Sequence, residues 1–125
     1  MIQNKRDLYD YMEADRLALG YSRNARPRIG RDEILRFEIL LRKYEYYSNR
    51  KNHIFGKIML LYYKVRYHGL SVRLGFSIPR NVFDKGLSIA HYGSIVVNSN
   101  ARVGRNCRIQ ENVTIGATGG GMIPR

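Results

Sequence analysis

The chain has 125 residues, with 22 lysine and arginine residues against 10 aspartate and glutamate residues, and a formal net charge of +12. This length allows one domain, or a helical module docked on a small second unit. The positive charge suggests anionic partners or substrates, but because no run of like charges resembles a nucleic-acid-binding tail, we expect no nucleic-acid partner.

Three features of the chain bear on its location. The start, Met1 to Asp7, lacks the apolar stretch of a signal peptide. Cys107 is the only cysteine, which excludes an internal disulfide and fits a reducing cytosol. The most apolar region, 54–70, is too short and too charged to cross a bilayer, although it is able to lie on a membrane surface. We therefore predict a cytoplasmic protein without a transmembrane segment.

Three helices are expected in the first half of the chain. The first spans about residues 7–19, and the second follows Asp32 as its N-cap and ends near Ser48 and Asn49. The third runs from Ile54 to His68 and stops at Gly69. Its predicted buried face consists of Phe55, Ile58, Met59, Tyr62 and Val65.

A six-residue repeat dominates the second half. Two companion series of apolar residues recur at this interval and are predicted to point inward. They are Ile95, Ala101, Cys107 and Val113, and Val97, Val103, Ile109 and Ile115. Three such hexads make one triangular coil of short parallel strands, and stacked coils bury a continuous core. The prediction is a parallel β-helix in which Cys107 is a small core residue and not a nucleophile.

His91 breaks this repeat. Six residues before Val97, the position that should hold an aliphatic side chain holds an imidazole. A lone histidine is usually a structural residue, but the break in register favours a functional one. The three histidines are too scattered for a metal site, and no carboxylate or thiol cluster completes one, so we expect no metal.

The residues that carry the repeat resemble a known family. Segments 86–98, 101–109 and 113–116 are similar to the serine O-acetyltransferases, which belong to the hexapeptide-repeat acyltransferases. Segments 13–20, 41–47 and 74–79 resemble the subgroup found with bacterial surface-polysaccharide genes. The resemblance implies an α+β fold, with an N-terminal helical module at 1–78 followed by a partial left-handed parallel β-helix at 79–125.

The resemblance also implies an activity, the transfer of acetyl from acetyl-CoA to a hydroxyl in cysteine biosynthesis, in a homotrimer or larger assembly. His91 occupies the place of the catalytic base, which takes the hydroxyl proton as the oxygen attacks the thioester. Backbone amides of the glycine-rich segment would lie near the thioester and stabilise the developing oxyanion. These residues are Gly116, Ala117, Thr118 and Gly119.

Departures from the family pattern keep alternatives open. Ala90 and Phe76 stand where the serine enzymes have aspartate, and Ile123 stands where they have histidine, so the acceptor is either serine or a sugar hydroxyl. Family members also continue with further coils that form much of the CoA groove. We therefore expect this chain to be truncated, to bind acetyl-CoA poorly and to aggregate. A third possibility is an inactive fragment that acts only in assembly.

Overall fold

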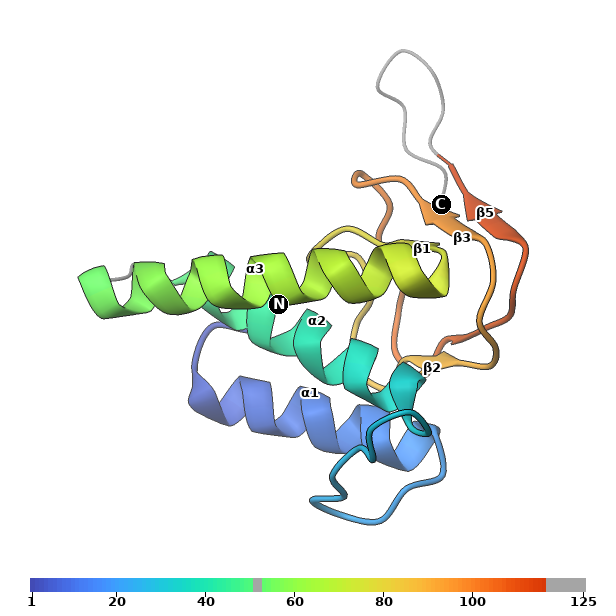
Figure 1. The fold of residues 1–125 in the computed structure, drawn as a ribbon, viewed down its shortest axis with the longest axis horizontal. Coiled ribbons are helices and arrows are strands. Elements are labelled where there is room, and N and C mark those ends of the chain that lie inside the picture. The colour runs from blue at the N-terminus through green and yellow to red at the C-terminus, as the bar shows by residue number, and fades with distance from the viewer. Residues whose placement is uncertain (51–52, 117–125) are drawn as a thin grey trace.

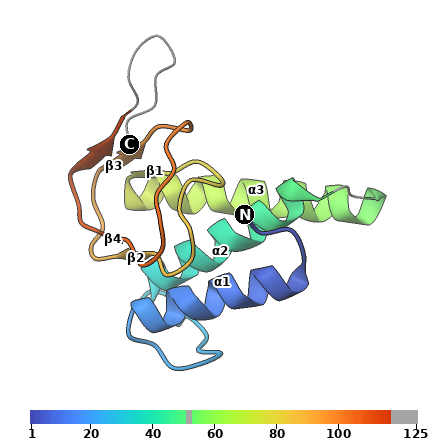
Figure 2. The same ribbon diagram turned by 180° about the vertical axis from the view of Figure 1, so that it is seen from behind.

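The computed structural model describes residues 1–50 and 53–116. Three helices come first in the chain, and five short strands follow (Figures 1 and 2). The helices are α1 (Lys5–Ala18), α2 (Glu33–Asn49) and α3 (Ile54–Leu74). The strands are β1 (Phe76–Ser77), β2 (Ser88–Ile89), β3 (Ile95–Val97), β4 (Arg108–Ile109) and β5 (Val113–Ile115).

The first two helices confirm the predicted positions. Asn4 caps α1, because its side chain accepts a hydrogen bond from the amide of Asp7. Asp32 occupies the N-cap position of α2, but its carboxylate makes no capping bond to the helix. It instead accepts hydrogen bonds from the Arg28 amide and the Tyr21 hydroxyl, both at 2.8 Å. Asp32 therefore orders the loop before the helix.

The predicted end of the third helix is wrong. Helix α3 continues through Gly69 to Leu74 and ends at Gly75, whose φ of +83° is the left-handed conformation that glycine adopts most readily. The amide of Gly75 donates to the carbonyl of Ser71 and closes the last turn. Gly69 lies inside the helix, where glycine is less favourable than other residues but does not end the helix.

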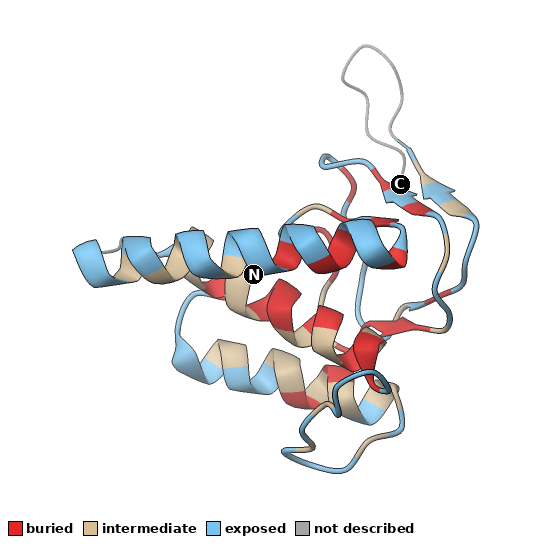
Figure 3. Cartoon of the chain, in the orientation of Figure 1, coloured by how far each residue is buried: buried red, intermediate tan, exposed pale blue. Residues whose placement is uncertain are grey.

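The predicted buried face of α3 is also wrong. Phe55, Ile58, Tyr62 and Val65 are exposed, and the residues that pack against the rest of the protein lie on the opposite side (Figure 3). The helix is apolar around most of its circumference, so its spacing alone did not identify the side that faces α2. The buried residues of α3 are Tyr67, Leu70, Ser71 and Leu74.

The strands form two small parallel sheets, with the order β1-β3-β5 in one and β2-β4 in the other. An isolated parallel bridge joins Phe83 to Val103. The expected partial left-handed β-helix is wrong, because the described residues contain only these strands of two or three residues and no extended β-helix. A strict repeat of three hexads would pair residues 18 apart. Ile95 pairs with Val113 in this way, but Ser88 pairs with Arg108, so extra corner residues interrupt the repeat.

One hydrophobic core joins the helices to the sheets. Phe37 of α2 contacts Tyr67 of α3 and Phe76 of β1, with ring centroids 5.0 and 4.9 Å apart. Both hexad series contribute to the core, but four of their members are only half-buried: Val103, Cys107, Val113 and Ile115. We expected the helical module to end at residue 78. Strand β1 lies before this boundary, but it pairs with β3, which lies after it.

Candidate functional site

His91 lies on the corner between β2 and β3. The corner backbone is held from both sides, since the Gly93 amide donates to the Leu74 carbonyl at 3.1 Å and the Ala90 amide donates to the Ile109 carbonyl at 2.9 Å. Gly93 has a φ of +125°, and a Cβ added there would lie 3.0 Å from the Cβ of Glu111. Three corners, at Gly75, Gly93 and Glu111, are therefore stacked closely.

The imidazole of His91 is exposed. Its register had predicted an inward, buried position, and that position is wrong because the chain bends at residues 91–93 instead of continuing a strand. Within the described residues, no group hydrogen-bonds to this side chain. The imidazole is thus accessible to a substrate from solvent, on a corner whose backbone is fixed.

The predicted acetyl-CoA-binding segment is only partly described. Gly116 follows β5 directly and is exposed. Ala117, Thr118 and Gly119 lie outside the described residues. Strand β5 pairs with β3, which follows the His91 corner, so Gly116 and His91 belong to consecutive turns of the chain.

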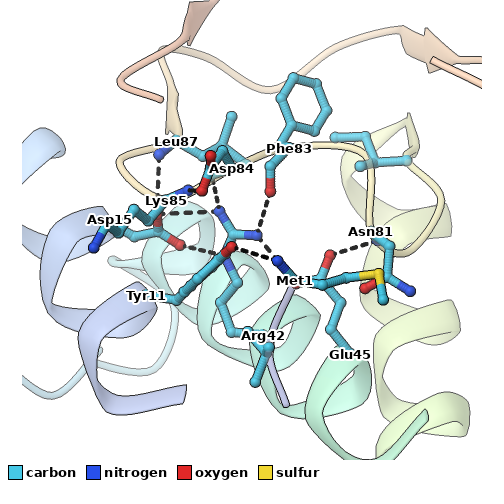
Figure 4. Close-up of polar contacts among 12 residues, drawn as sticks. Met1, Tyr11, Asp15, Arg42, Glu45, Asn81, Phe83, Asp84, Lys85 and Leu87 are labelled. Atoms are coloured by element: carbon cyan, nitrogen blue, oxygen red, sulfur yellow. Dashed lines mark hydrogen bonds and ion pairs between the residues drawn. The ribbon is translucent and has the colours of Figure 1, made fainter. Parts of the chain in front are cut away.

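Sequence reasoning missed a buried cluster of charges between the helices and the strands (Figure 4). Arg42 of α2 is completely buried, and all five of its N–H donors have acceptors. Nε donates to Asp15 at 2.7 Å, and Nη2 donates to Asp15 and to the Asp84 carbonyl. Nη1 donates to Glu45 at 3.0 Å and to the Phe83 carbonyl at 2.8 Å.

The carboxylates of this cluster bind the backbone of residues 81–89. Asp15 accepts hydrogen bonds from the amides of Gly86 and Leu87, both at 2.9 Å. Glu45 accepts from the Asn81 amide at 2.8 Å, and Glu38 accepts from the Ile89 amide at 3.0 Å. These helical side chains satisfy the backbone groups that a neighbouring strand would otherwise satisfy.

Burial controls the protonation of the cluster. Desolvation raises the pKa of Glu38 well above its ordinary value, and the nearby charge of Asp15 adds to this effect. Burial also raises the pKa of Asp15 and of Glu45, but the Arg42 charge opposes the shift at both. Glu38 has no direct contact with a cation, and one of its oxygens has no hydrogen-bond partner among the described residues. These surroundings favour the neutral acid more than water does.

Arg42 has a structural role in this cluster. Every donor of Arg42 is used within the protein, so none remains for a substrate. A sequence signal was present, because Glu38, Arg42 and Glu45 follow one another at helical spacing on the same side of α2 as the buried Phe37 and Leu41. Charges of opposite sign at core positions indicate a buried ionic cluster rather than a solvated face.

Two grooves accompany these sites. One has a volume of about 370 Å³ and lies beside the Arg42 cluster, between Tyr11, Glu45, Asp84 and Arg102. The other has a volume of about 530 Å³ and lies between α3 and the segment after β1, with Tyr44, Lys64, His68 and Arg80 in its wall. His91 lines neither groove, so a substrate of His91 would bind at the open corner.

Residues 1–50 and 53–116 contain no group of histidine, cysteine, aspartate and glutamate side chains that could hold a metal ion. In the same part of the chain, none of the helices has the length and apolar character needed to cross a bilayer.

Comparisons with known proteins identify no relative. No protein-family model, no curated protein and no solved structure matches this chain.

Proposed function

We propose that the protein is an acetyl-CoA-dependent O-acetyltransferase in which His91 is the general base. The acceptor is a hydroxyl of serine or of a sugar, and the glycine-rich segment 116–119 binds the acetyl donor. We place the reaction in the cytoplasm and in a homo-oligomer of three or more chains. The observation that carries the proposal is the exposed imidazole of His91 on a corner whose backbone is fixed.

The chemistry requires a base that is accessible and held in place. The acceptor hydroxyl becomes a nucleophile as the imidazole takes its proton, and its oxygen then attacks the thioester carbonyl. Collapse of the tetrahedral intermediate transfers acetyl to the oxygen, and the CoA thiolate leaves with the proton held by the imidazole. The fixed corner supports this role because a base must approach the reacting proton within hydrogen-bond distance.

Release of the CoA thiol from acetyl-CoA tests the proposal. At acetyl-CoA concentrations high enough to offset the poor binding expected for this chain, it should release thiol in the presence of serine or of a hexose, and the better acceptor distinguishes the two substrate classes. Replacement His91→Ala should lower the rate by roughly two to four orders of magnitude, the range typical of a lost general base.

His53→Ala is the matched control. His53 is also exposed, but it lies at the N-cap of α3 and its side chain makes no capping bond. This variant should retain the rate of the unmodified chain. Equal rates for the two histidine variants would contradict the role of His91, and a folded chain that releases no thiol with either acceptor would contradict the proposed activity.

A further inference from the structure

The outer face of α3 carries an apolar stripe that no other part of the described protein covers. Along the helix, large apolar side chains between 47% and 80% exposed recur at intervals of three and four residues. Figure 3 shows this exposed surface along most of the helix, including the end that projects beyond α2. The stripe consists of Ile54, Phe55, Ile58, Leu61, Tyr62, Val65 and Val72.

Positive charges flank the stripe on both sides. At about 100° of rotation per residue, the apolar side chains occupy an arc of about 120°. Lys57 and Lys64 lie along one border of that arc, and Arg66 and Arg73 lie along the other. All four are exposed, and α3 contains no acidic residue. A surface that fits this face is apolar at its centre and negatively charged around it.

We propose that α3 lies on the surface of an anionic lipid bilayer. The apolar stripe enters the boundary between head groups and acyl chains, and the flanking lysines and arginines contact lipid phosphates and carboxylates. Their long aliphatic stems allow the charged ends to remain at head-group level while the helix lies deeper. The helix lies in the plane of the surface, because its apolar stripe runs along its length.

The charge pattern favours lipid over a second copy of this chain. Pairing of two α3 stripes would bring the cations of one helix close to those of another. Neither helix has an acidic side chain to offset them, and among the described residues only Arg73 has a carboxylate nearby, that of Glu33 at 3.5 Å. An anionic bilayer offers the opposite charge and an apolar interior at the same site.

Sedimentation with lipid vesicles tests the proposal. The chain should bind vesicles made of equal parts phosphatidylserine and phosphatidylcholine more strongly than vesicles of phosphatidylcholine alone. The double variant Ile58→Ser, Leu61→Ser should lower the partition coefficient by at least about tenfold, since two aliphatic side chains no longer enter the bilayer. Both residues are exposed, so the fold should be retained, and circular dichroism checks this.

A second pair of variants separates a local charge effect from a general one. Lys57→Gln with Lys64→Gln should weaken binding to the anionic vesicles by roughly ten- to thirtyfold. Lys5→Gln with Arg6→Gln removes the same charge from the exposed start of α1 and should have a much smaller effect. Leu17→Ser with Ile29→Ser removes two exposed apolar side chains outside α3 and should leave binding unchanged.

Three results would overturn the proposal. One is equal binding to vesicles by the stripe variant and by the Leu17 and Ile29 control. Another is equal loss of binding from the α3 and α1 charge variants, which would indicate that net charge alone attracts the chain to lipid. The last is lipid-free oligomers, detected by sedimentation velocity, that dissociate only in the Ile58 and Leu61 variant, which would assign the stripe to a second copy.

Discussion

Arg42 joins more parts of the molecule than any other residue described above. It links Asp15 of α1 and Glu45 of α2 to the carbonyls of Phe83 and Asp84, and its side chain is fully buried. A buried ion pair gains little over a well-packed apolar pair, but loss of one partner leaves an uncompensated charge. Arg42 should therefore be intolerant of substitution.

Replacement Arg42→Met should lower the free energy of unfolding by about 3–5 kcal/mol. Asp15 and Glu45 lose the one cation that contacts them among the described residues, and two carbonyls lose a donor. Urea unfolding followed by circular dichroism at pH 7 measures the change. A loss below about 1 kcal/mol would show that the cluster does not stabilise the fold.

Glu38→Gln is the contrasting variant within the same cluster. Below about pH 4.5, Glu38 carries a proton in both the folded and the unfolded chain, so an isosteric amide should there change the free energy of unfolding by less than about 1 kcal/mol. The raised pKa means that the folded protein retains a proton that the unfolded chain releases above the ordinary value of 4.5. The stability that this proton supplies falls as the pH rises through the folded pKa, and the variant should show a smaller fall.

At the scale of elements, glycines at 75 and 93 set the ends and corners that position the strands. Gly75 ends α3 and turns the chain into β1, and Gly93 lets the His91 corner approach the Glu111 corner. Both have positive φ, whereas Gly69 lies in the interior of α3 with nothing within 4 Å of an added Cβ. The backbone conformation thus favours glycine at positions 75 and 93, whereas position 69 has no such requirement.

Gly93→Ala should lower the free energy of unfolding by about 1–3 kcal/mol, since its φ of +125° is strained for alanine and the new Cβ would press on Glu111. Gly69→Ala should raise it by up to about 1 kcal/mol through better helix propensity. Thermal unfolding of both variants shows whether each substitution lowers or raises the stability. Stabilisation by Gly93→Ala would contradict the close stacking of the corners.

The sequence was sufficient to predict the three helices and the start of α2 at Asp32, because polar N-cap residues and apolar spacing are local signals. It misplaced the end of α3, because Gly69 and Gly75 are both plausible stops and only the backbone conformation separates them. The exposed position of His91 was inaccessible to local reasoning, because it depends on a bend. The helical spacing of Arg42 indicated a buried charge, but its partners Asp15 and Phe83 lie far away in the sequence.

At the scale of the whole molecule, the helices and strands share one core. Phe37 and Leu41 of α2, Tyr67 of α3, and Ile89 and Ile95 of the strands belong to the same cluster of buried residues. Neither sheet has enough buried area to be stable alone, since each consists of two or three very short strands. The strands therefore depend on the helices for their stability.

We expect the helices and strands to unfold in one transition. Circular dichroism reports on the helices, and the reactivity of the half-buried Cys107 thiol reports on the strands near β4. In a urea series the two midpoints should coincide. Reactivity of Cys107 at clearly lower urea than the loss of helix would contradict a single cooperative unit.

The carboxylates of the Arg42 cluster also restrict where a further strand could pair with the strand region. They occupy the outer edge of residues 81–89, where Glu38 holds the Ile89 amide and Asp15 holds the amides of Gly86 and Leu87. An incoming strand cannot pair with these amides unless it displaces the carboxyl groups of Asp15 and Glu38. The helices thus block edge-to-edge association along residues 86–89, and a strand that extends the sheet of β2 and β4 has to pair with β4.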